Sequence, residues 1–296
     1  MDLDTFIVEA FCRIDDSLQE LALERPVRSR GPAPVLADSE VLTIEVVGEY
    51  LGLDRDVAIY RYFRRHYATF FPALRRVHRT TFVRQAANLW AVKERLWQRL
   101  LGCVPHDPAF ALVDSFPVPA CQFARAYRCR RSRGQATYGK DTLIRQTFYG
   151  FRFHARVCWP GVISRFVLAP ANVHELAAVP ALTARTGGLM LGDRNYHAPR
   201  EAEELARRGV ELLAPFRWAE RDPTPERSAL LNRFRYRIDT VFGQLAERYH
   251  AKKVWARDAW HLWSHLLRKV LSHTLAVLLA LAVGLPPLHL ADLLTE

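Results

Sequence analysis

Three aspartates stand where the chain could deliver carboxylates to one place. Asp114 follows the apolar stretch 110–113, and Asp193 follows the apolar stretch 189–192. Asp239 lies inside a later segment whose apolar residues recur at helical spacing. Carboxylate oxygens are preferred ligands of Mg²⁺, and two such ions about 4 Å apart promote displacement at a phosphodiester. The acids therefore predict a metal site for phosphoryl transfer, in which Asp114 bridges two ions and Asp193 and Asp239 each favour one.

Each acid also has a simpler explanation when it is considered alone. An aspartate directly after an apolar strand is often a helix N-cap or a turn residue, which would suffice for Asp114 or Asp193. Asp239 follows Arg235 by four residues, so an exposed ion pair on a helix would explain it. Only the joint placement of the three acids favours the metal site.

The elements that carry these acids follow a definite order along the chain. Apolar and alternating patterns predict strands over 109–113, 147–158, 163–168, 189–191 and 210–213. Helical patterns predict helices from 172 or 174 to about 187, over 199–208, and from 228 onward. This order is the ribonuclease H topology, with acids on the first strand, after the fourth strand and on the last helix. We therefore predict an α/β fold with a ribonuclease H-like mixed sheet flanked by helices.

The chain before this region has an all-helical pattern. Segments 38–51 and 55–66 are joined by a short turn containing Gly52, as in a helix-turn-helix unit, and 80–101 predicts a longer helix. Residues 55–84 contain eight arginines and one acid, with tyrosines and phenylalanine between them. The candidate DNA contacts here are Arg61, Arg64 and Arg65. An ordinary helical domain with a solvated basic face would give the same pattern.

A second basic segment, 115–140, contains no acid, and its Gly, Ser and Pro content predicts a loop. Its cations are Arg125, Arg128, Arg130, Arg131, Arg133 and Lys140. Such a run repels itself unless it faces solvent or a polyanion, so the loop is a candidate phosphate-binding segment. Arg194, beside the second acid, and Arg235, before the third, complete the candidate DNA contacts.

The composition fits a basic intracellular protein. The 296 residues carry a formal net charge of +11, which favours nucleic acid as a partner, with an anionic membrane surface as the second possibility. The five cysteines match no zinc spacing and are expected to be free thiols. The start lacks an export-signal pattern, and the apolar run 274–285 is too short to span a bilayer. We expect a cytoplasmic, nucleoid-associated protein without a membrane partner.

These patterns predict three parts of the chain. Residues 1–104 would form a helical DNA-binding domain, and 105–257 a ribonuclease H-like catalytic core. Residues 258–296 would form a C-terminal helix that packs on the core or lies at a dimer interface.

Several stretches in this order resemble bacterial insertion-sequence transposases, most of all the insertion-sequence-982 family of DDE enzymes. They read LVDSFPVP from Leu112, TFYGFRFH from Thr147, LAPANVHE from Leu168, LGDRNY from Leu191 and RIDTVFGQL from Arg237. The likeness extends to LTIEVVG over 42–48 and YRYFRRHY over 60–67, so it spans nearly the whole chain.

The resemblance implies a metal-dependent DDE transposase that uses Mg²⁺, for which Mn²⁺ would substitute. It implies binding of double-stranded DNA at terminal inverted repeats, cleavage at the element ends and transfer of the 3′-hydroxyl to target DNA. Pairing two ends would require a homodimer or a larger assembly. The family acids fall on Asp114, Asp193 and Asp239, although the family usually has Glu at the third position.

This shorter third acid leaves alternatives open. An aspartate is one methylene shorter than a glutamate, and a misplacement of about 1 Å can cost about a hundredfold in rate. The helix could pack closer, a water could bridge, or the chain could be a catalytically impaired or domesticated DNA-binding protein. A general nuclease of the same fold is a third hypothesis.

Overall fold

The computed structural model describes residues 1–28, 31–141 and 144–295, which include every predicted site residue. The chain divides into two compact units. We call Met1–Val104, Leu245–Ala251 and Trp260–Glu296 the helical unit, and Pro105–Gln244 and Lys252–Ala259 the sheet unit.

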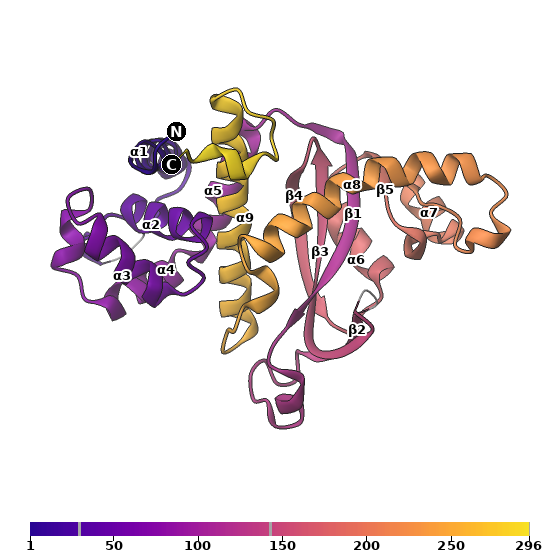
Figure 1. The fold of residues 1–296 in the computed structure, drawn as a ribbon, viewed down its shortest axis with the longest axis horizontal. Coiled ribbons are helices and arrows are strands. Elements are labelled where there is room, and N and C mark those ends of the chain that lie inside the picture. The colour runs from indigo at the N-terminus through magenta and orange to yellow at the C-terminus, as the bar shows by residue number, and fades with distance from the viewer. Residues whose placement is uncertain (29–30, 142–143, 296) are drawn as a thin grey trace. The chain divides into compact units, whose positions relative to one another are not determined.

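The sheet unit is built on one mixed six-stranded sheet (Figure 1). Its strands are β1 (Asp107–Pro119), β2 (Thr137–Asp141), β3 (Gln146–Trp159), β4 (Val162–Pro170), β5 (Gly188–Leu191) and β6 (Val210–Leu213). The strand order is β2-β3-β1-β5-β6, and β4 also pairs with β3. Pairings within β1–β4 are antiparallel, whereas β5 pairs in parallel with both β1 and β6. Every predicted strand is present.

Three helices of the sheet unit follow the predicted order: α6 (Glu175–Leu182), α7 (Pro199–Ala206) and α8 (Pro225–Glu247). The prediction of a loop over 115–140 was wrong at both ends. Strand β1 continues to Pro119, a 3-10 helix η2 (Phe123–Arg128) follows, and β2 begins at Thr137. Two prolines near the end of β1 suggested a break. The pairing of β1 with β5 covers only Phe110–Leu112, so this end is an edge strand, where proline is tolerated.

The two faces of β1 pack against different helices. Val113 belongs to a buried cluster that includes Val179 and Leu182 of α6 and Leu205 of α7. On the other face, the Phe116 ring lies 4.9 Å from the ring of Phe242 in α8. Because side chains alternate along a strand, Asp114 lies on the same face as Phe116 and therefore toward α8.

The helical unit contains α1 (Leu3–Glu24), α2 (Asp38–Tyr50), α3 (Asp56–His66), α4 (Arg79–Asn88), α5 (Trp90–Cys103) and most of α9 (Ala259–Ala282). The single helix predicted over 80–101 is interrupted at Leu89 and forms α4 and α5. Between α2 and α3, Gly52 has a φ of +77°, and a Cβ on Gly48 would lie 2.8 Å from Ile59. Glycine at these positions permits the tight turn and the close packing of the two helices.

Helix α9 is buried, as its apolar sequence predicts. It is long and apolar enough to cross a membrane, but 83% of its most apolar window is buried inside the protein, as in the core helix of a soluble protein. It also carries the buried cations Arg268 and Lys269, which pair with Glu45 and Glu49 of α2. The carboxylates that pair with these cations lie in α2, and most of α9 belongs to the helical unit.

His154 in the middle of β3 gives a pH-dependent prediction. It is fully buried, neither ring nitrogen has a hydrogen-bond partner among the described residues, and burial lowers its pKa to about 4. The unfolded chain binds this proton near pH 6.5, so stability present above that pH is lost as pH falls toward 4. Because the unfolded chain takes up this proton more readily than the folded protein does, His154 should lower the unfolding free energy by about 2 kcal/mol when the pH is reduced from 7 to 5.

Urea unfolding of the wild type and His154→Leu at both pH values would measure this difference. The variant should lose less stability on acidification than the wild type. If the wild type and His154→Leu lost the same stability on acidification, the lowered pKa of His154 would not explain the pH dependence.

Candidate active site

Asp114 and Asp193 lie side by side at the carboxyl end of the parallel strands. In the register of β1 and β5, Leu112 stands opposite Leu191. Asp114 follows two residues later within β1, and Asp193 follows two residues later, just past the end of β5. Neighbouring strands are about 4.8 Å apart, so the continued register brings the two carboxylates together. Asp193 also caps the short 3-10 helix η3 (Arg194–Tyr196), accepting hydrogen bonds from Asn195 N at 2.8 Å and Nδ2 at 3.1 Å. Asp193 therefore both caps η3 and lies near Asp114.

Glu175, the first residue of α6, is a third acid near these two. Its Oε1 accepts a hydrogen bond from Ser115 Oγ at 2.7 Å and lies 3.5 Å from Arg152 Nη1. Arg152 also donates to Ser115 Oγ at 3.1 Å. The sequence suggested only an N-capping role for this segment, and His174 supplies that cap by accepting from Leu176 N. The signal that sequence reasoning missed was an acid that begins a helix after a short connection from β4.

Arg235 of α8 connects the last helix to the first strand. Its Nη2 donates to Asp114 Oδ2 at 3.2 Å, with both side chains mostly buried. The sequence offered Asp239 as the partner for an exposed ion pair, but the salt bridge of Arg235 in the described structure is with Asp114. The packing of Phe242 on Phe116 explains this choice, because it holds α8 over the face that carries Asp114.

Burial and like charges disfavour the ionised form of the carboxyl groups in this site. Burial raises the pKa of Asp114 to about 7, against the opposing effect of Arg235, and the charges of Asp193 and Glu175 raise it further. Burial and the charge of Glu175 also raise the pKa of Asp193. The hydroxyl of Tyr196 is buried there without a hydrogen-bond partner among the described residues. Arg235 and Arg152 offset only part of the negative charge of these three carboxylates, and an acidic site of this kind suits a bound cation.

Asp239 occupies a different environment from the other acids. It is exposed on α8, one helical turn after Arg235. Within residues 1–28, 31–141 and 144–295, no group of three His, Cys, Asp or Glu side chains is arranged to hold a metal ion. The charges of Asp114, Asp193 and Glu175 act on one another, whereas Asp239 is exposed on α8.

The predicted DNA-contacting cations are mostly exposed. Exposed residues include Arg61, Arg64 and Arg65 on α3, and Arg125, Arg128, Arg130, Arg131, Arg133 and Lys140 in and around η2 and β2. Arg194 is half-buried, with its Nη1 3.4 Å from the carbonyl oxygen of Phe216. Apart from Arg194 and Arg235, these cations lie where a polyanion could reach them.

Comparisons with known proteins assign part of the chain to a family. Residues 106–255, just over half of the chain, match the family described as the transposase DDE domain, and the match includes all four acids discussed above. One similar solved structure is a cryo-EM structure of the piggyBac transposase synaptic complex with hairpin DNA. It is 11% identical with a TM-score of 0.44, and the similarity covers 96% of this chain and 76% of that one. No curated protein matches the chain. On the family match, the chain belongs to the DDE transposases.

Proposed function

We propose that this protein is a metal-dependent DNA transposase of a bacterial insertion sequence, most like the insertion-sequence-982 family. It would bind the terminal inverted repeats, cleave at the element ends and join the 3′-hydroxyl to target DNA. The observation that carries the proposal is the pair of partly buried carboxylates, Asp114 and Asp193, just beyond the point where the parallel pairing of β1 and β5 ends. The order of the antiparallel and parallel strands supports a ribonuclease H-like core.

We propose that Asp114 and Asp193 hold Mg²⁺, or Mn²⁺ in its place. The raised pKa values and the unpartnered Tyr196 hydroxyl fit a site that a divalent cation would complete. When bound, the metal would neutralise charge on the phosphoryl group and activate the attacking oxygen. The chain's own contribution is positional: Arg235 orients Asp114, while Arg152 and Glu175 fix Ser115 beside it.

We propose Asp239 as the third metal ligand and Glu175 as a positioning residue. Residues four apart on a helix are neighbours, so Asp239 lies near Arg235 and, through it, near Asp114. Glu175 is already engaged by Ser115 and Arg152. Asp239→Asn is expected to lower the rate of DNA cleavage about a hundredfold, whereas Glu175→Gln should lower it less.

Single-turnover cleavage by both variants would measure these effects. A larger loss for Glu175→Gln would reverse the two assignments. The conservative variant Asp239→Glu addresses the impaired-enzyme alternative: unchanged or lower activity indicates a site adapted to aspartate, whereas a large gain indicates a weakened or domesticated protein.

The proposed DNA reader is the helix-turn-helix-type pair α2 and α3, acting in a homodimer or larger assembly. Arg61 and Arg65 are exposed on α3. If each neutralises one DNA phosphate, the double alanine variant should reduce the steepness of log Kd against log salt concentration by about 2. Fluorescence anisotropy at several salt concentrations would measure this slope. Arg13→Ala combined with Arg200→Ala, which removes two exposed arginines elsewhere, is the control, and an equal change there would reject α3 as the contact surface.

A cleavage comparison tests the function itself. The protein and Mg²⁺ are incubated with DNA from the ends that flank the gene and with a scrambled duplex of equal length. A transposase should cut the true ends and leave the scrambled DNA largely intact. Equal cutting of both would favour a general nuclease, because a repeat-specific enzyme must read bases as well as phosphates.

A further inference from the structure

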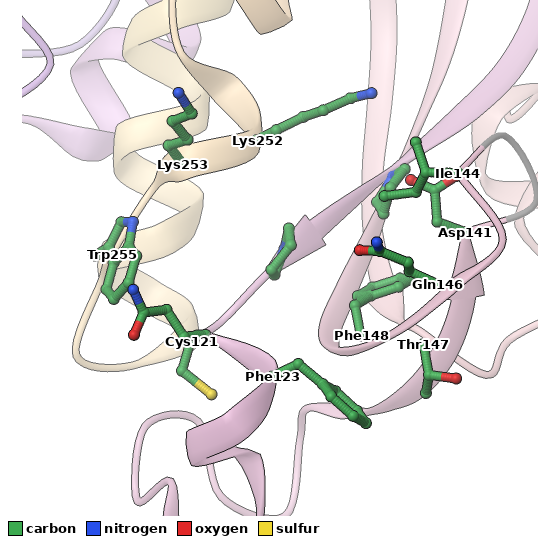
Figure 2. Close-up of a pocket in the computed structure, with 13 residues that line it drawn as sticks. Cys121, Phe123, Asp141, Ile144, Gln146, Thr147, Phe148, Lys252, Lys253 and Trp255 are labelled. Carbon is green, nitrogen blue, oxygen red and sulfur yellow. The ribbon is translucent and has the colours of Figure 1, made fainter.

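A cavity of about 270 Å³ lies in the sheet unit, beyond the end of β1 (Figure 2). Its lining comes from the end of β1, the segment around Phe123 at the start of η2, the end of β2, the start of β3, and the segment of Lys252, Lys253 and Trp255. In Figure 2, Trp255 lies on one side, with Gln146 and Phe148 across from it and Phe123 along the lower side. The proposed metal site uses none of these residues.

Two of the aromatic side chains at this cavity are unusually exposed. Phe123 is 55% exposed and Trp255 is 53% exposed, whereas Phe148 is buried. Exposed apolar surface that gathers at one place, as these two rings do at the cavity, is typical of a binding site. The guanidinium of Arg131 lies 5.7 Å from the centre of the Trp255 ring, so a cation already borders this surface.

The size of the cavity and its mostly apolar lining with a few amide groups indicate a flat ring with a polar edge as its occupant. Its volume is below the roughly 300–1,000 Å³ of pockets that take drug-sized ligands, so it has room for a single ring system. Aromatic side chains offer stacking surfaces, and the amides of Gln122 and Gln146 offer both donors and acceptors. A nucleobase has a stacking face and a hydrogen-bonding edge, and therefore matches both features.

The surrounding charge indicates that the ring is attached to a phosphate backbone. Lys252 and Lys253 line the cavity, and the adjoining η2 segment carries exposed Arg125 and Arg128. Segment 115–140 contains no acid, and the described lining of the cavity has one carboxylate, the buried Asp141, beside its two lysines. A groove of cations with interleaved aromatic rings is the arrangement by which proteins bind unpaired nucleic acid strands.

We propose that this cavity captures the base of an unpaired nucleotide in the bound DNA, stacked on Trp255 and Phe123. The inference rests on the proposed function and extends it to a second DNA site. Along β1, Pro117 and Pro119 are three and five residues from Asp114, which corresponds to about 10–17 Å of strand. At 3.4 Å per step of DNA, the captured nucleotide would lie about three to five positions from the phosphate at Asp114.

The test compares three DNAs of one fixed sequence in buffer with EDTA, so that no cleavage occurs. The first is a fully paired 30-base-pair duplex, the second carries a two-nucleotide thymine bulge, and the third has abasic residues in that bulge. Fluorescence anisotropy measures each affinity. The wild type should bind the thymine bulge at least about fivefold more tightly than the abasic bulge, because each stacked base contributes to binding.

The variants then assign this preference to the cavity. Trp255→Ala should weaken binding of the thymine bulge about 5- to 100-fold and change the paired duplex less than about twofold. Trp255→Tyr should retain most of the preference. Trp218→Ala is the matched control, since Trp218 is 57% exposed and lies 5.7 Å from the guanidinium of Arg217, but it is absent from the lining of the cavity.

Equal binding of the thymine and abasic bulges by the wild type would overturn the inference, as would an equal effect of Trp255→Ala on all three DNAs. If the chain binds paired duplex but shows no preference for an unpaired base, this inference alone fails. If it binds none of the three DNAs, the proposed function fails with it.

Discussion

Replacing Asp114 or Asp193 by asparagine is expected to abolish DNA cleavage without destabilising the fold. An amide removes the negative charge and half of the oxygen ligands from the proposed metal site, so the rate should fall by about a thousandfold or more. The unfolding free energy of the Asp114→Asn variant should rise although its cleavage rate falls. The folded-state pKa of Asp114 is about 7, above its ordinary value of 3.8, so ionisation of this buried carboxyl destabilises the fold as pH rises from 4 to 7.

At pH 8 without divalent metal, Asp114→Asn should therefore gain up to about 4 kcal/mol of unfolding free energy. Cleavage of end DNA and urea unfolding measure the two effects on the same preparation. Asp107→Asn is the control, because Asp107 lies exposed on the same strand and should change neither property. Cleavage within a few fold of the wild type, or a loss of stability, would reject the role assigned to Asp114.

Replacing Arg268 by methionine is expected to cause the largest loss of stability in the helical unit. The guanidinium is 2% exposed and contacts Glu45 at 3.0 Å, Glu49 at 2.6 Å and Asp56 at 2.5 Å. Lys93 and Lys269 complete a buried set of three cations and three carboxylates. Removing one member leaves buried charge without compensation, which typically costs about 3–5 kcal/mol.

The shift in the urea unfolding midpoint of Arg268→Met measures this cost. Arg99→Met is the matched control: Arg99 of α5 pairs with Glu20 and Glu24 of α1, but all three side chains are at least 34% exposed. Exposed pairs contribute about 0–1 kcal/mol, so the control should change little. A midpoint for Arg268→Met within error of that control would show that the buried network adds no net stability.

The strands and the first two acids could be predicted from the sequence because their signals are local. Apolar runs bounded by turn residues mark β3, β4, β5 and β6. Asp114 and Asp193 lie near each other because each follows the parallel pairing of β1 with β5 by two residues. Both residues lie within 106–255, the part of the chain that matches the transposase DDE domain family.

The remaining features depend on packing that no local pattern encodes. Glu175 joins the site through Ser115 and Arg152, which come from β1 and β3, so its role appears only once those strands pair. Arg235 could pair with Asp239 on its own helix, and the packing of α8 on the sheet instead places it against Asp114. The position of α9 follows from carboxylates in α2, more than two hundred residues earlier in the chain.

Strand transfer tests the central claim most directly, because it requires both the metal site and recognition of the element ends. A labelled duplex that carries an element end with a free 3′-hydroxyl is incubated with plasmid DNA, and joined product is measured. We expect product with Mg²⁺ or Mn²⁺, and none with EDTA or with Asp114→Asn. Equal joining in EDTA, or by Asp114→Asn, would contradict a transposase whose chemistry depends on metal held by Asp114 and Asp193.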